Sequence, residues 1–129
     1  MDAAVRGYLA ECRTLPGLDL DIDGCLHVWE AAMALPGADR VVSPRWLHGD
    51  PTVDIVVAWE LLDRAGRDLF RSLVRVDEAT WLRGRAWALA IAAMTFPYSW
   101  DTMPDRCAAR LALAHAVLTD AAGPSPTGR

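Results

Sequence analysis

Residues 77–100 read DEATWLRGRAWALAIAAMTFPYSW, and this segment decides the fold. Asp77 stands where a helix N-cap belongs, because its side chain can accept a hydrogen bond from a free N–H group of the first turn. Charged residues occur as far as Arg85, and none follows in residues 86–96. A helix that is apolar on every side is buried, so the pattern predicts a long helix whose second half passes through the core. Pro97 is expected to end that helix.

Helical periodicity continues on both sides of this segment, interrupted by Pro and Gly. Further helices are predicted over about 2–15, from Asp21 or Asp23 to about 35, over 50–62, over a short amphipathic stretch marked by Leu69, Phe70 and Leu73, and after Asp101 or Thr102 as its cap. Residues 55–59 are apolar on every side and are expected to be central in the packing. The only candidate extended piece, 41–47, is too short to found a sheet.

These patterns predict an all-α architecture of five or six helices packed around a Trp-rich core. Residues 1–121 are expected to form a single helical domain, because no linker or repeat divides them. Residues 122–129, rich in Gly and Pro, are expected to be a disordered tail.

The composition describes a globular chain. The 129 residues are 53% apolar and carry a net charge of −4, which suits one ordinary domain and gives no basic patch for nucleic acid. No apolar run approaches the roughly 20 residues that span a bilayer, and no secretion signal is recognisable, so we expect no membrane partner and a cytoplasmic location. Cys12, Cys25 and Cys107 fit neither a disulfide framework nor a zinc site and are expected to be buried thiols.

The segment WLHGDPTVD, residues 46–54, contains the candidate catalytic residues. In kinase-like phosphoryl transfer, an Asp on a catalytic loop orients or deprotonates the acceptor hydroxyl. The HGD triplet of His48 and Asp50 resembles the catalytic loop of the aminoglycoside phosphotransferase family, and GDPTVDI at 49–55 is similar to that family's later Gly-Asp-Pro-x-x-Asp-Leu segment. Both motifs share one Gly-Asp pair, so the stretch that should separate them is missing.

The resemblance extends over nearly the whole chain. Segments 28–32, 56–59, 76–81, 83–89 and 97–98 look like the family's helix before the catalytic loop and its closing helices. The resemblance implies the C-terminal helical lobe of the family, without the nucleotide lobe, with Asp50 as a vestigial base, His48 as the residue that orients its loop, and Asp54 as a brace for that loop. Asp50 also fits a plain helix N-cap before Pro51.

Composition argues against kinase activity independently of any family. The chain contains no Lys, Asn or Gln. Kinases of this kind use a Lys to pair the phosphates and an Asn to hold the second metal, and no Gly-rich phosphate loop is present. We therefore expect no phosphoryl transfer by this chain alone, and we predict no cofactor and no metal site.

A ligand cleft is the main candidate site that remains. It would be lined by Asp50, Tyr98, Trp100 and Asp101, with Asp54 as a further substrate-binding residue. Acids beside aromatic rings suit a cationic or sugar-like ligand. Trp100 stands out because it lies between two helices, where no apolar periodicity demands its burial.

An EF-hand-like calcium site is a minor alternative. Asp19, Asp21, Asp23 and Glu30 match the spacing of its oxygen ligands, with Gly24 at the turn position. The Pro-Gly pair at 16–17 interrupts the helix that should enter such a loop, and the same acids can cap a helix instead.

Three functional hypotheses follow from the sequence. The first is a degenerate phosphotransferase-like domain that binds a small molecule or a partner protein. The second is a helical cleft reused by a non-kinase enzyme with Asp50 or Asp101 as acid-base groups. The third is an interaction module that self-associates into a homo-oligomer through exposed apolar surface.

Overall fold

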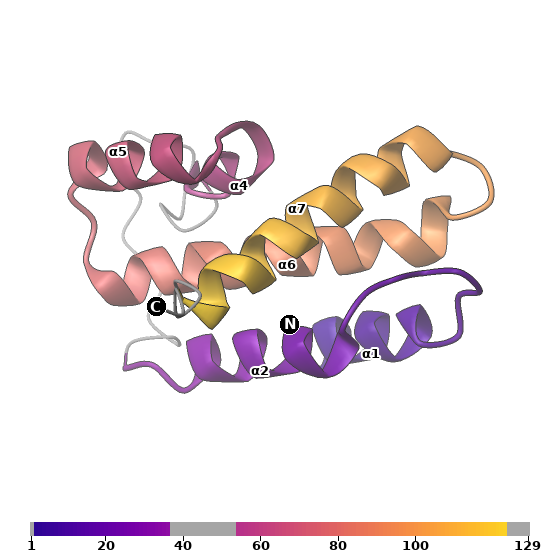
Figure 1. Cartoon of the computed structure of the whole chain (residues 1–129). Coiled ribbons are helices and arrows are strands. Elements are labelled where there is room, and N and C mark those ends of the chain that lie inside the picture. Colours follow the sequence, from indigo (N-terminus) through magenta and orange to yellow (C-terminus); the bar gives the residue numbers. More distant parts are fainter. Residues whose placement is uncertain (1, 37–53, 124–129) are drawn as a thin grey trace, which may run out of the picture.

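The computed structural model describes residues 2–36 and 54–123, and every regular element in that part of the chain is an α-helix (Figure 1). The helices are α1 (Asp2–Cys12), α2 (Ile22–Met33), α4 (Val57–Leu61), α5 (Arg64–Val74), α6 (Glu78–Ser99) and α7 (Pro104–Ala122). The predicted all-α class is confirmed. The predicted extended piece at 41–47 and residues 124–129 of the predicted tail lie outside the described residues.

Helix α6 is the centre of the fold and contacts α1, α2, α4 and α7. Asp77 caps it as predicted, since its Oδ1 accepts from the backbone N of Thr80 at 2.7 Å. The charge-free half is buried, and many of its buried side chains are small, which lets neighbouring helices approach closely from several directions. Figure 1 shows α6 and α7 as an antiparallel pair, with α1 and α2 on one side and α4 and α5 on the other.

Pro97 does not end α6, contrary to the prediction; the helix continues to Ser99. Proline leaves the carbonyl four residues earlier without its usual N–H partner. In this helix that carbonyl belongs to Ala93, and the thiol of Cys12 in α1 donates to it at 3.5 Å. The interruption of the helix ladder therefore becomes a contact between α1 and α6.

The first cap on the chain follows the prediction and the last does not. Asp21 caps α2, with its Oδ1 2.9 Å from the backbone N of Gly24, where a Cβ would lie only 2.6 Å from Asp21 Oδ2. The N-cap of α7 is Met103, which makes no side-chain cap, rather than Asp101 or Thr102. The fixed φ of Pro104 at the first helical position is enough to start that helix.

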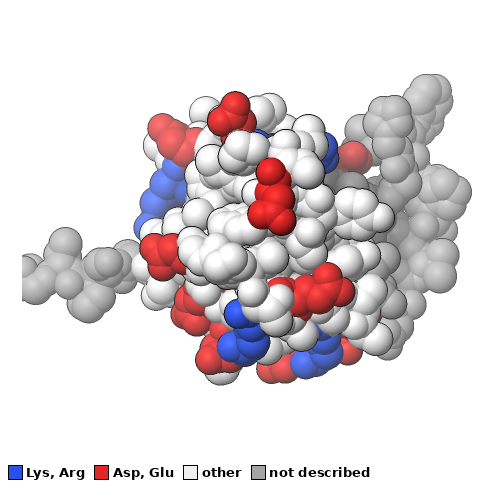
Figure 2. All heavy atoms as spheres, turned by 90° about the vertical axis from the view of Figure 1, so that its right-hand side faces the viewer, with Lys and Arg blue, Asp and Glu red and all other residues white. Residues whose placement is uncertain are grey.

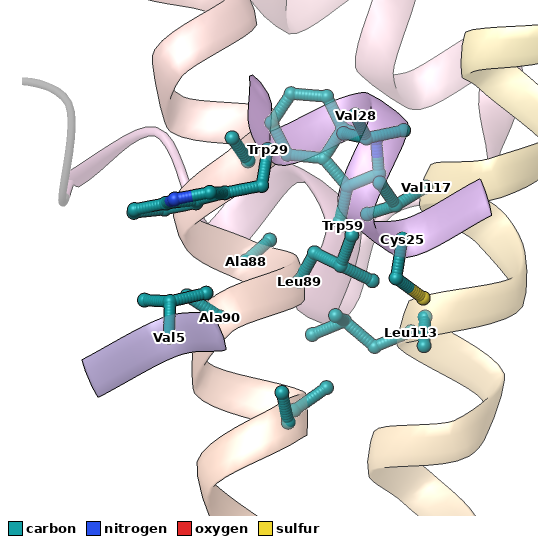
Figure 3. Packing of buried hydrophobic residues seen from close by; sticks show 14 of the residues in the cluster. Val5, Cys25, Val28, Trp29, Trp59, Ala88, Leu89, Ala90, Leu113 and Val117 are labelled. Carbon is teal, nitrogen blue, oxygen red and sulfur yellow. The ribbon is translucent and has the colours of Figure 1, made fainter. Parts of the chain in front are cut away.

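One hydrophobic core joins the helices. In Figure 3 the side chains of Trp29, Leu89 and Val117 come from α2, α6 and α7 and belong to one interior cluster. Residues 55–59, predicted to be central, are buried except for the half-buried Val57. Each buried aromatic residue removes a large apolar area from water, so the aromatic rings supply much of this core.

The indole N–H groups of three tryptophans find acceptors that tie distant segments together. Trp29 Nε1 donates to Asp2 Oδ1 at 2.7 Å, Trp59 Nε1 to Asp120 Oδ2 at 2.9 Å, and Trp100 Nε1 to the carbonyl of Pro16 at 3.1 Å. A buried indole normally needs such a partner. The donation from Trp29, followed by the ion pair with Arg6, lowers the pKa of Asp2.

Helix α5 is packed with its apolar stripe outward. The sequence predicts an amphipathic helix marked by Leu69, Phe70 and Leu73, yet Leu69 is 61% and Leu73 is 70% exposed, and only Phe70 is partly buried. Arg67 of the same helix is 7% exposed. The helix exists as predicted, but its buried residue is Arg67, and two leucines lie on the surface.

None of the helices in the described part of the chain combines the length and apolarity needed to cross a membrane.

The cysteine thiols are expected to be unreactive in the folded protein. Burial raises the pKa of Cys12 to about 11 and of Cys25 to about 12, and it also raises the pKa of Cys107. Thiolate is the reactive form, so at pH 8 modification by a thiol reagent should be slower than in the unfolded chain by roughly a hundredfold for Cys12 and roughly a thousandfold for Cys25. Mass spectrometry of protein modified with and without denaturant measures this ratio. Fast modification of the native protein would contradict the burial of these thiols.

Candidate functional site

His48 and Asp50 lie outside the described residues. Asp54, their predicted neighbour, is the first described residue before α4 and is half-buried. Its Oδ2 is buried and makes no hydrogen bond to the described residues.

Tyr98, Trp100 and Asp101 lie together where α6 ends and the turn to α7 begins. Tyr98 is 87% exposed, and Asp101 is also exposed. Trp100 is half-buried, because its ring packs edge to face on Phe96, with the centroids 6.2 Å apart, and its N–H is bonded to the carbonyl of Pro16. The side chain predicted to contact a ligand therefore has a structural role at the end of the helix pair.

Two open hollows flank this end of α6. One of about 340 Å³ includes Tyr98 and Arg106, and the other, of about 240 Å³, is apolar and includes Trp100 and Cys107. Neither lining includes Asp54 or Asp101. In Figure 2 this end of the molecule faces the viewer, and Asp and Glu side chains are spread among uncharged ones.

Asp54 does not join the residues at the α6–α7 turn. Helix α4, which follows Asp54, packs at the opposite end of the helix pair, where the Trp59 ring lies 4.8 Å from the ring of Trp81 and its N–H reaches Asp120. From Trp81 to Trp100 the helix rises about 28 Å at roughly 1.5 Å per residue. Asp54 therefore lies apart from Tyr98, Trp100 and Asp101, and Asp50, the remaining residue of the predicted cleft, lies outside the described residues.

Three of the acidic residues predicted for the alternative calcium site make separate contacts elsewhere in the fold. Asp21 caps α2, Asp23 forms an ion pair with Arg13, and Glu30 forms one with Arg6 at 2.8 Å. Helix α2 already begins at Ile22, so the loop that would gather these oxygens around an ion is not formed. Within residues 2–36 and 54–123, no cluster of three or more His, Cys, Asp or Glu side chains is suited to hold a metal ion.

A different group of side chains forms a strongly charged cavity, lined by residues of α5, α6 and α7. It has a volume of about 150 Å³ and is lined by Arg64, Arg67, Asp68, Arg71, Trp81, Leu82, Arg85 and Asp120; we call it the arginine cavity. Its lining has four arginines and two aspartates. The chain as a whole is acidic, with a net charge of −4, so this positive charge is concentrated locally.

Arg67 and Asp120 form the rigid wall of the arginine cavity. Arg67 Nε donates to Asp120 Oδ2 at 2.8 Å and Nη2 donates to Oδ1 at 3.1 Å, while Nη1 donates to the carbonyl of Leu62 at 2.7 Å. Both side chains are largely buried, at 8% and 18% exposure. Such a two-pronged pair fixes the guanidinium in one orientation.

Arg85 has no comparable partner. Its Nε is buried and makes no hydrogen bond within the described part of the chain. Burial is the main cause of a lowered pKa for this guanidinium; Asp120 opposes the shift and the charge of Arg71 adds to it. Arg71 itself lies over the Trp81 ring, with its Cζ 5.2 Å from the ring centroid. The arrangement can accept an anion, because an anion in the cavity would supply the counter-charge that Arg85 lacks among the described residues.

Sequence reasoning missed this cavity because its side chains come from three separate helices. One usable signal was present: Arg64, Arg67, Arg71 and Arg75 recur at intervals of three or four residues, which places them on one face of a helix. A basic face of this kind predicts acidic partners, but the sequence alone does not indicate that one of them is Asp120.

The fold and its cavity define an all-α domain with a basic site between three helices. Comparisons with models of known protein families, with curated proteins and with solved structures find no match to this chain.

Proposed function

We propose that this chain is a binding domain that does not transfer phosphate by itself, and that it holds a small ligand in the arginine cavity. The observation that carries the proposal is Arg85, a half-buried arginine that lines a cavity with three other arginines and has no ion pair among the described residues. Its Nε is buried without an acceptor among those residues. A buried, unsatisfied charged donor is costly, and a site for a ligand is a standard reason for keeping one.

The resemblance to the helical lobe of the aminoglycoside phosphotransferase family stays part of this proposal as a hypothesis of descent. The lack of Lys and Asn in the sequence supports the non-catalytic side of it. The rival cleft for a cationic or sugar-like ligand has weaker support, because Trp100 is engaged with Pro16 and Asp101 lines neither hollow. The second hypothesis, acid-base chemistry by Asp50 or Asp101, gains no support from the exposed Asp101. Three unpaired, buried cysteines favour a cytoplasmic location as part of the same proposal.

Ligand binding in the arginine cavity is tested by thermal unfolding with and without Arg85. Inorganic phosphate, a short dicarboxylate, an aminoglycoside, choline, glucose and magnesium-ATP are added in parallel. At ten times its Kd, an anion that binds the cavity should raise the Tm by about 4–7 °C, since a ligand that binds only the folded state stabilises it. Arg85→Met should abolish this rise, while leaving the free energy of unfolding without ligand unchanged or about 1 kcal/mol higher, because an unpaired charge is removed from the interior.

Arg83→Met is the matched control for that experiment. It removes the same charge from the same helix, but Arg83 does not line the cavity and its Nη1 reaches the carbonyl of Pro36. The control protein should keep the full rise in Tm. Stabilisation by choline, glucose or an aminoglycoside that survives Arg85→Met would move the binding site away from this cavity and contradict the proposal.

Self-association is a second candidate function, favoured by the outward leucines of α5. Leu69 and Leu73 are one helical turn apart and more than half exposed. Paired apolar side chains on a helix surface suit contact with another apolar surface, and a second copy of the chain offers the same stripe.

Sedimentation measures this second candidate directly. The protein is expected to show a concentration-dependent dimer at micromolar concentration, and Leu69→Glu with Leu73→Glu should leave a monomer with an unchanged circular dichroism spectrum. Tyr98→Ser is the control, since it removes another exposed aromatic group at the far end of α6 and should not affect the dimer. A strict monomer at these concentrations would exclude self-association through α5.

A further inference from the structure

We infer that the arginine cavity selects a small dianion, either a phosphate monoester or a short dicarboxylate, over monoanions, cations and nucleotides. The inference rests on the proposed function, because it names the ligand class of the same cavity. It depends on three properties of the cavity: its charge, its free donors and its size.

The charge of the lining calls for two negative charges. Asp120 is occupied by Arg67, and both of its oxygens already accept hydrogen bonds, from Arg67 and from Trp59. Asp68 offsets one of the three remaining arginines, Arg64, Arg71 and Arg85. Two positive charges are therefore left without a counter-charge in the lining, and a dianion balances them where a monoanion leaves one.

The free donors come from two helices. Arg85 belongs to α6, and Arg64 and Arg71 belong to α5. None of the three forms an ion pair or a side-chain hydrogen bond with residues 2–36 or 54–123, apart from the contact of Arg71 with the Trp81 ring. Planar guanidinium groups bind carboxylate and phosphate oxygens two at a time, so several arginines from two helices suit a ligand with several oxygens.

The size of the cavity limits the body of the ligand. About 150 Å³ is well below the roughly 300–1,000 Å³ of sites that enclose drug-sized ligands. It accommodates an oxyanion and a few carbon atoms, and Trp81 and Leu82 provide an apolar wall for those carbons. A nucleoside triphosphate is too large to be enclosed, which separates this cavity from a nucleotide site.

Calorimetric titration with methyl phosphate and methyl sulfate tests the choice of charge. The two probes have similar shape, but at pH 8 methyl phosphate is a dianion and methyl sulfate a monoanion. We expect methyl phosphate to bind at least tenfold more tightly at pH 8. A phosphate monoester takes up its second proton near pH 6, so its affinity should fall about tenfold between pH 8 and pH 5.

The pH dependence is assigned to the ligand by the methyl sulfate control. The charged groups that face the site are Arg64, Arg67, Asp68 and Arg71 from α5, Arg85 from α6 and Asp120 from α7. Any change in their charge would alter both titrations, whereas protonation of the ligand alters only that of methyl phosphate. Succinate is the third arm: tight binding of succinate without methyl phosphate would identify a dicarboxylate as the source of the dianion.

The outcomes separate the inference from the proposed function. Equal affinity for methyl phosphate and methyl sulfate, abolished by Arg85→Met, would overturn the inferred selectivity for a dianion. It would leave the arginine cavity as the binding site. An affinity for methyl phosphate that does not change with pH would likewise overturn the selectivity for a dianion. Binding of no anion at all, in the wild-type protein and in Arg83→Met, would overturn both. Arg71→Met serves as a second variant beside Arg85→Met, and circular dichroism confirms that each is folded.

Discussion

The ion pair between Arg67 and Asp120 is the interaction on which the arrangement of α4, α5 and α7 depends. Asp120, near the end of α7, accepts from Arg67 of α5 and from the indole of Trp59 in α4. A buried ion pair stabilises only when its remaining donors and acceptors are satisfied. Here the carbonyl of Leu62 accepts a further hydrogen bond from Arg67. The hydrogen bonds within the protein therefore replace much of the hydration that both charged groups lose on burial.

The same pair explains why α5 exposes its leucines and why a basic cavity exists. With Arg67 buried against Asp120 of α7, Leu69 and Leu73 lie on the surface and Arg71 lies over Trp81. Asp120 balances the charge of Arg67. The buried Nε of Arg85 is left without a hydrogen-bond acceptor among the described residues. Departures from good local packing of this kind are typical of functional sites, where stability is lost in return for binding.

The parts of the fold that could be predicted are those that local sequence determines. The charge-free run of α6 and the caps Asp21 and Asp77 needed no information from elsewhere in the chain. The direction of α5 could not be predicted, because it depends on an ion pair between residues 53 positions apart, which outweighs the leucine stripe. Pro97 was misjudged for a similar reason, since the thiol that bonds the freed carbonyl comes from α1.

The candidate site was less accessible still to prediction. The resemblance to a phosphotransferase directed attention to His48 and Asp50, which lie outside the described residues and stay predictions. Tyr98, Trp100 and Asp101 lie together because they are neighbours in the sequence, and their role in binding a ligand stays a prediction. Whether such residues line a pocket depends on which of their polar groups are bonded to the rest of the fold. The arginine cavity is built from three helices, and only their packing brings its charges together.

A double-mutant cycle at Arg67 and Asp120 tests most directly whether their ion pair holds α5 in place. Arg67→Met, Asp120→Ala and the double variant are unfolded in urea, and the coupling energy is obtained from the three changes in the free energy of unfolding. Each single variant leaves a buried charge alone, so the account predicts a coupling of about 2 kcal/mol or more, with the double variant less destabilised than the sum of the two singles. A coupling below about 0.5 kcal/mol would mean that the two residues act independently and would contradict the account.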